Sequence, residues 1–210
     1  MSSEAESGCI VASVDLCAWS MQAIVSSFAA PLPPPLPLFV GSHSSAALFV
    51  TLTSSDGALR GCIGTLEPVE LGSGLRDFAL RSAFHDSRFR PLLQSELAGL
   101  TLSVSLLCGH EDLGPGRALE WVVGVHGITA SFVSDGGAYR ATFLPEISLE
   151  QRWTQAETLH KAIRKAGFKG LVDDRLLATV RVTRFRSTKA HLTYEAYLAR
   201  GGLAAATVLT

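Results

Sequence analysis

Seven residues near the middle of the chain alternate strictly between apolar and small polar side chains. Leu100, Leu102, Val104 and Leu106 are separated by Thr101, Ser103 and Ser105. Successive side chains of a strand point to opposite faces of a sheet, so this period of two predicts a strand. We expect the four apolar side chains to face the core and the three polar ones to face away from it, which makes the strand half-buried.

Other segments predict further strands and several helices. The turn residues 54–57 and the sequence Asp135-Gly136-Gly137 each separate two strand-like segments, as in a hairpin. Strands are predicted at residues 47–53, 58–65, 122–133, 139–143 and 177–186. Helices are predicted at residues 11–29, 73–84, 118–121, 146–153, 154–166 and 194–200. Because helices and hairpin-linked strands are mixed along the chain, we predict an α+β fold.

The size and composition predict one domain, or one domain with two lobes. The chain has 210 residues, of which 47% are hydrophobic and 18% charged. This content is enough for a sizeable core and too apolar for a disordered chain. The four cysteines are widely spaced and give neither a disulfide framework nor a zinc-binding pattern, so we expect a reducing compartment.

The N-terminal region predicts neither a targeting segment nor a membrane span. It carries Glu4 and Glu6 but no basic residue, unlike a signal or transit peptide. The apolar residues 16–30 are too few, and too interrupted by Gln22, to cross a bilayer. We therefore expect a soluble cytoplasmic or nuclear protein that does not bind membranes.

Charge is distributed unevenly along the chain. Residues 1–139 hold 6 basic and 13 acidic residues, whereas residues 140–210 hold 12 basic and 6 acidic residues. Two solvated faces would explain this distribution, and so would a basic surface for an anionic partner. Arg181, Arg184 and Arg186 surround Phe185 and are the candidates for an RNA contact, with the ring stacking on a base. We favour the alternative that these arginines protect a solvated strand edge.

Cys62 stands in the stretch from Ala58 to Thr65, between two glycines. Gly61 and Gly64 predict a strand that another part of the chain approaches closely. Cys62 could serve as a nucleophile or redox thiol, with Arg60 lowering its pKa and His126 or His85 as the base. A free cysteine in a core strand also behaves as a small hydrophobic residue, and we favour this structural role.

Other polar residues have a functional and a structural interpretation. Asp86 follows His85 directly, and adjacent residues of a helix do not face each other, so a local turn bond or a pair with Arg88 is favoured. Glu146 could act as a base, although a favourable position at a helix N-terminus is the preferred interpretation. Residues 110–112 give only a weak metal signal, and the glycine pairs 72/74 and 114/116 lack a dinucleotide fingerprint. No metal site is assigned, and the cofactor is unknown.

An ordered set of motifs resembles the AMMECR family, which is named after a chromosomal region linked to Alport syndrome with elliptocytosis. The motifs are LRGCIGT, SGLRDFALRSAFHDSRF, SVSLL, VGVHGI and ATFLPE, followed by RKAGF, TRFRS and LTYEAYLA, as in eukaryotic members. The resemblance implies an α+β fold with an antiparallel sheet, flanking helices and a second, smaller lobe. The family's activity is not established, although prokaryotic members are associated with a Memo-type protein and a radical-SAM protein. The resemblance assigns no catalytic residue.

The resemblance also implies the division of the chain. The AMMECR-like domain is expected at residues 9–200, between a flexible N-terminus at 1–8 and a flexible tail at 201–210. A proline-rich segment at 31–45 departs from the family pattern. Its PxxP spacing permits an SH3-type ligand, but a connecting loop is the favoured interpretation.

These observations together favour a non-enzymatic binding or regulatory domain with an unidentified protein partner. The candidate ligand-binding residues are Arg60, Cys62, Asp86, Arg88, His126 and Glu146, which we expect to line one cleft. No catalytic residue is assigned, and the candidates for one are Cys62, His126 and Glu146. The alternatives are an enzyme that uses Cys62, and an RNA-binding module that uses the basic C-terminal third.

Overall fold

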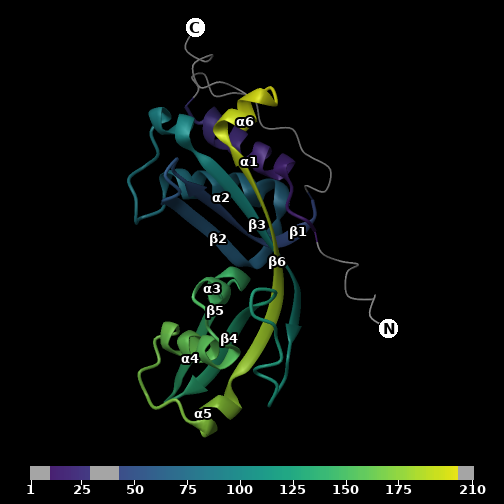
Figure 1. Ribbon diagram of the computed structural model, residues 1–210, viewed down its shortest axis with the longest axis vertical. Helices are drawn as coiled ribbons and strands as arrows, with labels where there is room; N and C mark the ends of the chain where they lie inside the picture. Colours follow the sequence, from purple (N-terminus) through teal and green to yellow (C-terminus); the bar gives the residue numbers. More distant parts are fainter. Residues whose placement is uncertain (1–9, 29–42, 203–210) are drawn as a thin grey trace, which may run out of the picture. The chain divides into compact units, whose positions relative to one another are not determined.

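The computed structural model describes residues 10–28 and 43–202 (Figure 1). The six strands form a sheet with the order β2-β1-β3-β6-β4-β5, in which β1 with β2, β4 with β5 and β4 with β6 are antiparallel. The chain divides into two compact units. We call Ile10–Leu106 with the described residues from Thr188 onward the large unit, and Leu107–Ser187 the small unit. The predicted α+β class with a second, smaller lobe is confirmed. The expected bounds of the domain and its tails stay predictions, and the proline-rich segment lies largely outside the described residues.

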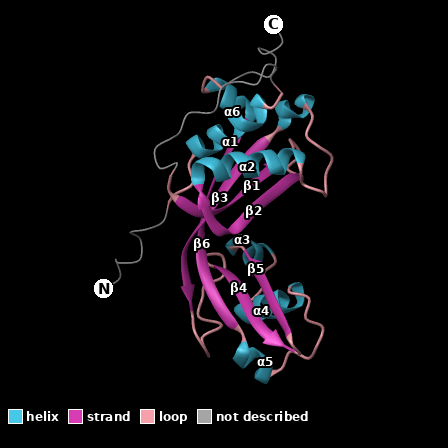
Figure 2. Ribbon diagram, turned by 180° about the vertical axis from the view of Figure 1, so that it is seen from behind, coloured by secondary structure: helices cyan, strands magenta, loops and turns pink. Residues whose placement is uncertain are grey.

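The large unit packs helices against β-strands (Figure 2). Its helices are α1 (Val14–Ser26), α2 (Leu71–Phe84) and α6 (Tyr194–Ala199), with the 3-10 helix η1 (Gln94–Gly99), and its hairpin joins β1 (Ser45–Thr53) to β2 (Leu59–Glu70). Strands β3 (Thr101–Asp112) and β6 (Arg181–Thr193) contribute to both units. α1 begins at Ser13, whose side chain accepts a hydrogen bond from the Leu16 N–H. One apolar core joins the buried faces of α1, α2, β1 and β3.

Strand β3 confirms that the apolar side chains face the core. It corrects the expectation that the opposite face, with the polar side chains, is exposed. Leu100, Leu102, Val104 and Leu106 are all buried in the large-unit core. Ser103 and Ser105 are also buried, at 8% and 5% exposure, so the expected half-buried strand is wrong. β3 lies between β1 and β6. Small side chains on such an inner strand have same-face neighbours on both sides, and these shield them from solvent.

The small unit is built on a hairpin of β4 (Gly127–Ser134) and β5 (Gly137–Phe143). The predicted tight turn is confirmed, because Asp135 and Gly136 both have positive φ, as a two-residue type I′ turn requires. Three helices accompany the hairpin: α3 (Pro145–Glu150), α4 (Gln155–Lys165) and α5 (Asp174–Thr179). The capping box of Thr154 and Glu157 starts α4 as predicted, and α4 packs its apolar stripe onto the hairpin.

Three predicted elements of the small unit differ from the structure. Residues 118–121 form turns and not a helix, and β4 begins only at Gly127. The predicted strand at residues 177–186 is divided between α5 and β6, because Asp173 accepts a hydrogen bond from the Leu176 N–H and caps a helix there. Across the described residues, no helix is both long and apolar enough to cross a membrane.

Candidate functional site

Strand β2 carries the glycines that flank Cys62, and both lie against backbone. A Cβ atom on Gly61 would lie 2.1 Å from the Ser82 carbonyl oxygen of α2. A Cβ atom on Gly64 would lie 2.3 Å from the Leu48 carbonyl oxygen. Neither position has room for a side chain, so the close approach predicted from the two glycines is confirmed. The Ser82 hydroxyl also joins the hairpin strands, because it donates to the Val50 carbonyl and accepts from the Ile63 N–H.

Asp86 and Arg88 cover the outer edge of β2 at Cys62. Strand β2 lies at one end of the strand order, so none of the described strands pairs with its outer backbone groups. The Cys62 N–H donates to Asp86 Oδ2 at 2.9 Å, and Arg88 Nη2 donates to the Cys62 carbonyl at 3.1 Å. These two side chains, which we call the Asp86–Arg88 clamp, therefore pair with Cys62 as a further strand would.

The clamp is itself held together by charge. Arg88 donates from Nε to Asp86 Oδ1 at 2.9 Å and from Nη2 to Oδ2 at 2.7 Å, and its backbone N–H also reaches Oδ1. The structure thus shows both contacts proposed for Asp86, the local turn bond and the ion pair. The Arg88 hydrogen bonds, helped by the Cys62 N–H, lower the pKa of the buried Asp86 carboxyl although burial acts in the opposite direction.

The Cys62 thiol is half-buried and faces the neighbouring strand. Cys62 pairs with Thr51 in the register of the β1–β2 hairpin, and its Sγ lies 3.3 Å from Thr51 Oγ1. Both Cys62 and Cys17 are free thiols. Cys17 is fully buried, and burial raises its pKa to about 11. Cys108 is disulfide-bonded, which the wide spacing of the cysteines did not predict.

Arg60 is paired with Glu96. Its Nε lies 2.8 Å from Glu96 Oε1 and its Nη2 lies 3.2 Å from Oε2, with only 12% of the Arg60 side chain exposed. This contact lowers the pKa of Glu96 to about 2, and the Leu93 N–H adds to the effect. The guanidinium carbons of Arg60 and Arg88 lie 6.0 and 5.4 Å from the centroid of the Phe89 ring. The sequence suggested that the charge of Arg60 acts on the Cys62 thiol. In the structure this charge stabilises the Glu96 carboxylate.

The remaining candidates belong to the small unit or to a helix end. His85 follows α2, and its backbone N–H caps that helix at the Arg81 carbonyl. His126 Nδ1 accepts a hydrogen bond from the Val122 N–H at 3.0 Å. Burial, followed by the charges of Arg184 and Arg186, lowers the pKa of His126 and favours the neutral ring. Glu146 stands in the first turn of α3, the helix-terminal position that the sequence favoured.

The six candidate ligand-binding residues therefore fall into two groups. Arg60, Cys62, Asp86 and Arg88 lie in the large unit, where the structure brings the last three into direct contact and places Arg60 beside Phe89. His126 and Glu146 belong to the small unit. The expected cleft lined by all six stays a prediction. Among the described residues, no three histidine, cysteine or acidic side chains gather as a metal site would require.

Two of the three candidate arginines of β6, Arg181 and Arg184, are paired with acidic side chains, whereas no such pair is seen for Arg186 among the described residues. Arg181 lies 2.7 Å from Asp112, and Arg184 lies 2.7 Å from Glu111 and also donates to the Glu120 carbonyl. Phe185 is fully buried, so it offers no ring for stacking on a base, and this corrects the stacking part of the RNA alternative. The strand-edge interpretation is also wrong, because β6 lies between β3 and β4.

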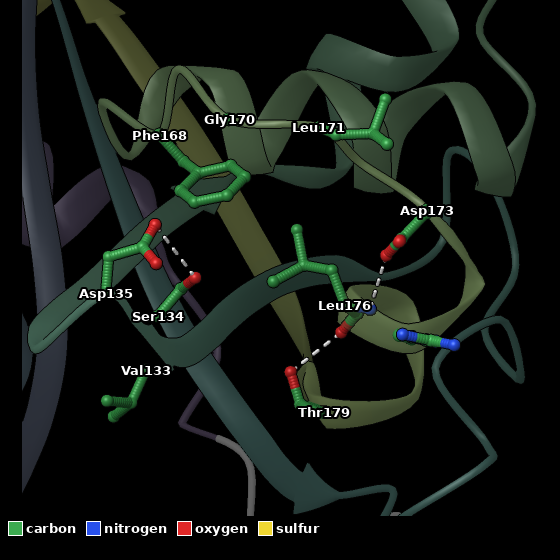
Figure 3. A pocket seen from close by; sticks show the side chains of 10 residues that line it. Val133, Ser134, Asp135, Phe168, Gly170, Leu171, Asp173, Leu176 and Thr179 are labelled. Carbon is green, nitrogen blue, oxygen red and sulfur yellow. Dashed lines mark hydrogen bonds between the residues drawn. The ribbon is translucent and has the colours of Figure 1, made fainter.

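A hollow in the small unit was missed by sequence reasoning. It opens between the β4–β5 turn and residues 168–179, has a volume of about 370 Å³, and is shown in Figure 3. The turn residues were recognisable in the sequence, but the apposition of the two segments depends on how α4 and α5 fold back. A second, smaller pocket of about 240 Å³ lies in the large unit beside Arg60 and Glu96.

The fold and its clamped edge strand define a two-unit α+β protein in which the LRGCIGT motif forms an outer strand. The chain belongs to the AMMECR1 family, whose model matches residues 14–190. The resemblance seen in the motifs is therefore confirmed.

Several uncharacterized proteins are similar to this chain. One from Schizosaccharomyces pombe is 40% identical over 157 residues, which cover 73% of this chain and 79% of the relative. One from Arabidopsis thaliana is 35% identical over 195 residues, covering 90% and 89%. The crystal structure of an uncharacterized protein from Pyrococcus horikoshii matches with a TM-score of 0.68 at 28% identity, covering 84% of this chain and 89% of that one.

Proposed function

We propose that the protein is a non-enzymatic binding domain that assembles with another protein. The observation that carries the proposal is that the charged side chains around Cys62 are already paired with each other or with the backbone. Both oxygens of Asp86 accept hydrogen bonds from Arg88, one of them also from the Cys62 N–H, and Arg60 is paired with Glu96. A nucleophilic thiol needs a base within hydrogen-bond reach and a group that orients this base. Here the charged side chains hold the backbone of an edge strand, which is a structural task.

The exposed apolar side chains support a protein as the partner. Six of the ten large apolar side chains that are exposed in the described residues belong to the small unit. They are Leu119, Val122, Val125, Val133, Leu149 and Leu171. Single exposed apolar residues are ordinary, so the support for a partner lies in their enrichment in the smaller unit and not in any one of them.

Gel filtration of a gentle lysate from the native cells tests this proposal. The full chain with a small tag, and the same chain with Cys62→Ala, would replace the endogenous copy. We expect both to elute well above the 22.3 kDa of the chain, because the thiol is not needed for assembly. Elution of the wild type at its own mass would contradict the proposal. Loss of the complex in folded Cys62→Ala alone would contradict the structural role of the thiol.

A further inference from the structure

The hollow of the small unit combines an apolar wall with an exposed apolar rim. Phe168 and Leu176 line it as buried side chains, at 6% and 9% exposure. Val133 and Leu171 also line it and are 70% and 78% exposed, the highest values among the large apolar side chains that the structure describes. A partner that covered this rim would remove both side chains from water, and apolar burial is the main favourable contribution to association.

The wall of the hollow is fixed before any partner binds. Arg164 Nη1 donates to the Phe168 and Gly170 carbonyls at 3.0 and 2.8 Å, which anchors the loop after α4. The Phe168 ring meets the Phe132 and Tyr139 rings edge to face, with centroids 5.4 and 5.3 Å apart. A Cβ atom on Gly170 would lie 2.6 Å from Phe168 Cζ, so the ring occupies the space of a side chain there. A preformed site loses little conformational entropy on binding, and this favours affinity.

Two carboxylates approach the hollow from opposite sides, as Figure 3 shows for Asp135 and Asp173. Asp135 is placed by the β4–β5 turn and accepts only a long bond of 3.4 Å from Ser134. Asp173 uses Oδ1 to cap α5 through the Leu176 N–H. Within the described part of the chain, neither forms an ion pair. Arg175 is the single cationic side chain of the lining, so the charges there favour a cationic group on the partner.

We propose that this hollow docks a short segment of a partner protein in which a bulky apolar side chain stands next to a lysine or arginine. The apolar side chain enters between Phe168 and Leu176 and is covered by Val133 and Leu171. The basic side chain pairs with Asp135 or Asp173. This inference rests on the proposed function, because it names the site and the chemistry through which the binding domain recognises its partner.

Titration of short peptides into the ¹⁵N-labelled full chain tests the chemistry directly. The probe is the capped peptide Gly-Lys-Leu-Lys-Gly, and the controls replace its leucine by alanine or both lysines by glutamate. We expect amide shifts confined to residues 133–135 and 168–179, at least tenfold weaker binding of the alanine peptide, and no binding of the glutamate peptide. Raising the salt concentration should weaken binding of the lysine peptide, because exposed charge pairs are screened.

Four substitutions test the site. Val133→Thr and Leu171→Ser remove exposed apolar surface, and together they should weaken the probe at least fivefold. Asp135→Asn and Asp173→Asn should reduce both the affinity for the lysine peptide and its salt dependence. Asparagine tolerates positive φ and caps helices, so the turn and α5 are kept. The matched control is Val11→Thr, which changes an apolar side chain that is 66% exposed in the large unit and should leave binding unchanged.

Three outcomes would overturn the proposal. The first is the absence of amide shifts at the hollow, and the second is binding of the glutamate peptide as tight as that of the lysine peptide. The third is that free leucine amide causes the same shifts as the lysine peptide, because the hollow would then be a small-molecule site. Gel filtration of the lysate separates this failure from failure of the proposed function. A wild-type chain that elutes at its own mass refutes protein binding altogether. A wild-type complex that persists in the Val133→Thr, Leu171→Ser variant refutes only the docking site.

Discussion

Asp86 Oδ2 accepts the backbone N–H of Cys62 at 2.9 Å, although the two residues are 24 positions apart. Through this bond the turn after α2 fixes the outer edge of β2 at the centre of the LRGCIGT motif. The Asp86–Arg88 clamp thus gives a structural role to two residues that the sequence suggested as ligand-binding candidates. An open strand edge is a hazard for aggregation, and a paired carboxylate and guanidinium remove that hazard at one residue.

Replacing Asp86 should lower stability in a pH-dependent way. The pKa of Asp86 is lowered in the folded protein, whereas an unfolded aspartate has a pKa of about 3.9. The folded state therefore favours the charged form, and its contribution to the free energy of unfolding is complete above about pH 5 and is lost as pH falls below about 4. We expect Asp86→Asn to cost about 1–3 kcal/mol at pH 7, from the loss of charged hydrogen bonds.

Urea denaturation at several pH values measures this effect. The difference between wild type and Asp86→Asn should be largest at neutral pH and should shrink toward pH 3. Glu96, whose pKa is also lowered, is present in both proteins, so its contribution cancels in the difference. A difference that stays constant down to pH 3 would show that the carboxylate charge of Asp86 does not stabilise the fold.

The Cys62 thiol should react slowly in the native protein but before Cys17. Cys62 is half-buried, whereas Cys17 is fully buried with a raised pKa, so iodoacetamide at about pH 8.5 should modify Cys62 first and Cys17 only on unfolding. At about pH 6.5 we expect little reaction, since among the described residues the hydrogen-bond partner of the thiol is the Thr51 hydroxyl and not a base. Peptide mass spectrometry over time measures both rates. Fast, selective alkylation at this lower pH would favour the enzyme hypothesis.

Local patterns in the sequence predicted much of the fold, and long-range contacts account for what they missed. The alternation at Leu102 and Val104, the capping box at Thr154 and the turn at Asp135 are each encoded by residues a few positions apart. The burial of Ser105 depends on β3 having a neighbour on both sides, which no local period reveals.

Only part of the candidate site was predicted, because its other contacts are also long-range in the sequence. Gly61 and Gly64 indicated a close approach, and the separation of Asp86 and Arg88 by only one residue suggested their pairing. The partner of Arg60 is Glu96, 36 positions away, and nothing in the sequence distinguishes this carboxylate from the others. The hollow of the small unit likewise depends on two segments that meet only after folding.

Arg181 and Arg184 should contribute little to nucleic-acid binding. Both guanidinium groups are paired with acidic side chains and Phe185 is buried, so these two arginines are poorly placed to neutralise phosphates and the ring cannot stack on a base. We expect no salt-dependent binding of single-stranded RNA by fluorescence anisotropy at about 50 mM salt. Tight binding that weakens steeply with salt, and that is lost when Arg184 and Arg186 are changed to alanine, would instead support the RNA-binding alternative.

The last prediction concerns the contact between β2 and α2 at Gly61. A Cβ atom there would lie 2.1 Å from the Ser82 carbonyl oxygen, a backbone atom that cannot rotate away. Gly61→Ala must therefore push α2 from β2, and we expect a cost of about 1–3 kcal/mol or more from overpacking. Gly137→Ala is the matched control, because its Cβ would meet the Tyr139 side chain at 3.3 Å, where a small shift suffices. Thermal unfolding should show a clearly lower Tm for Gly61→Ala than for the control. Equal Tm values for the two variants would mean that α2 does not pack against β2 as closely as the structure shows.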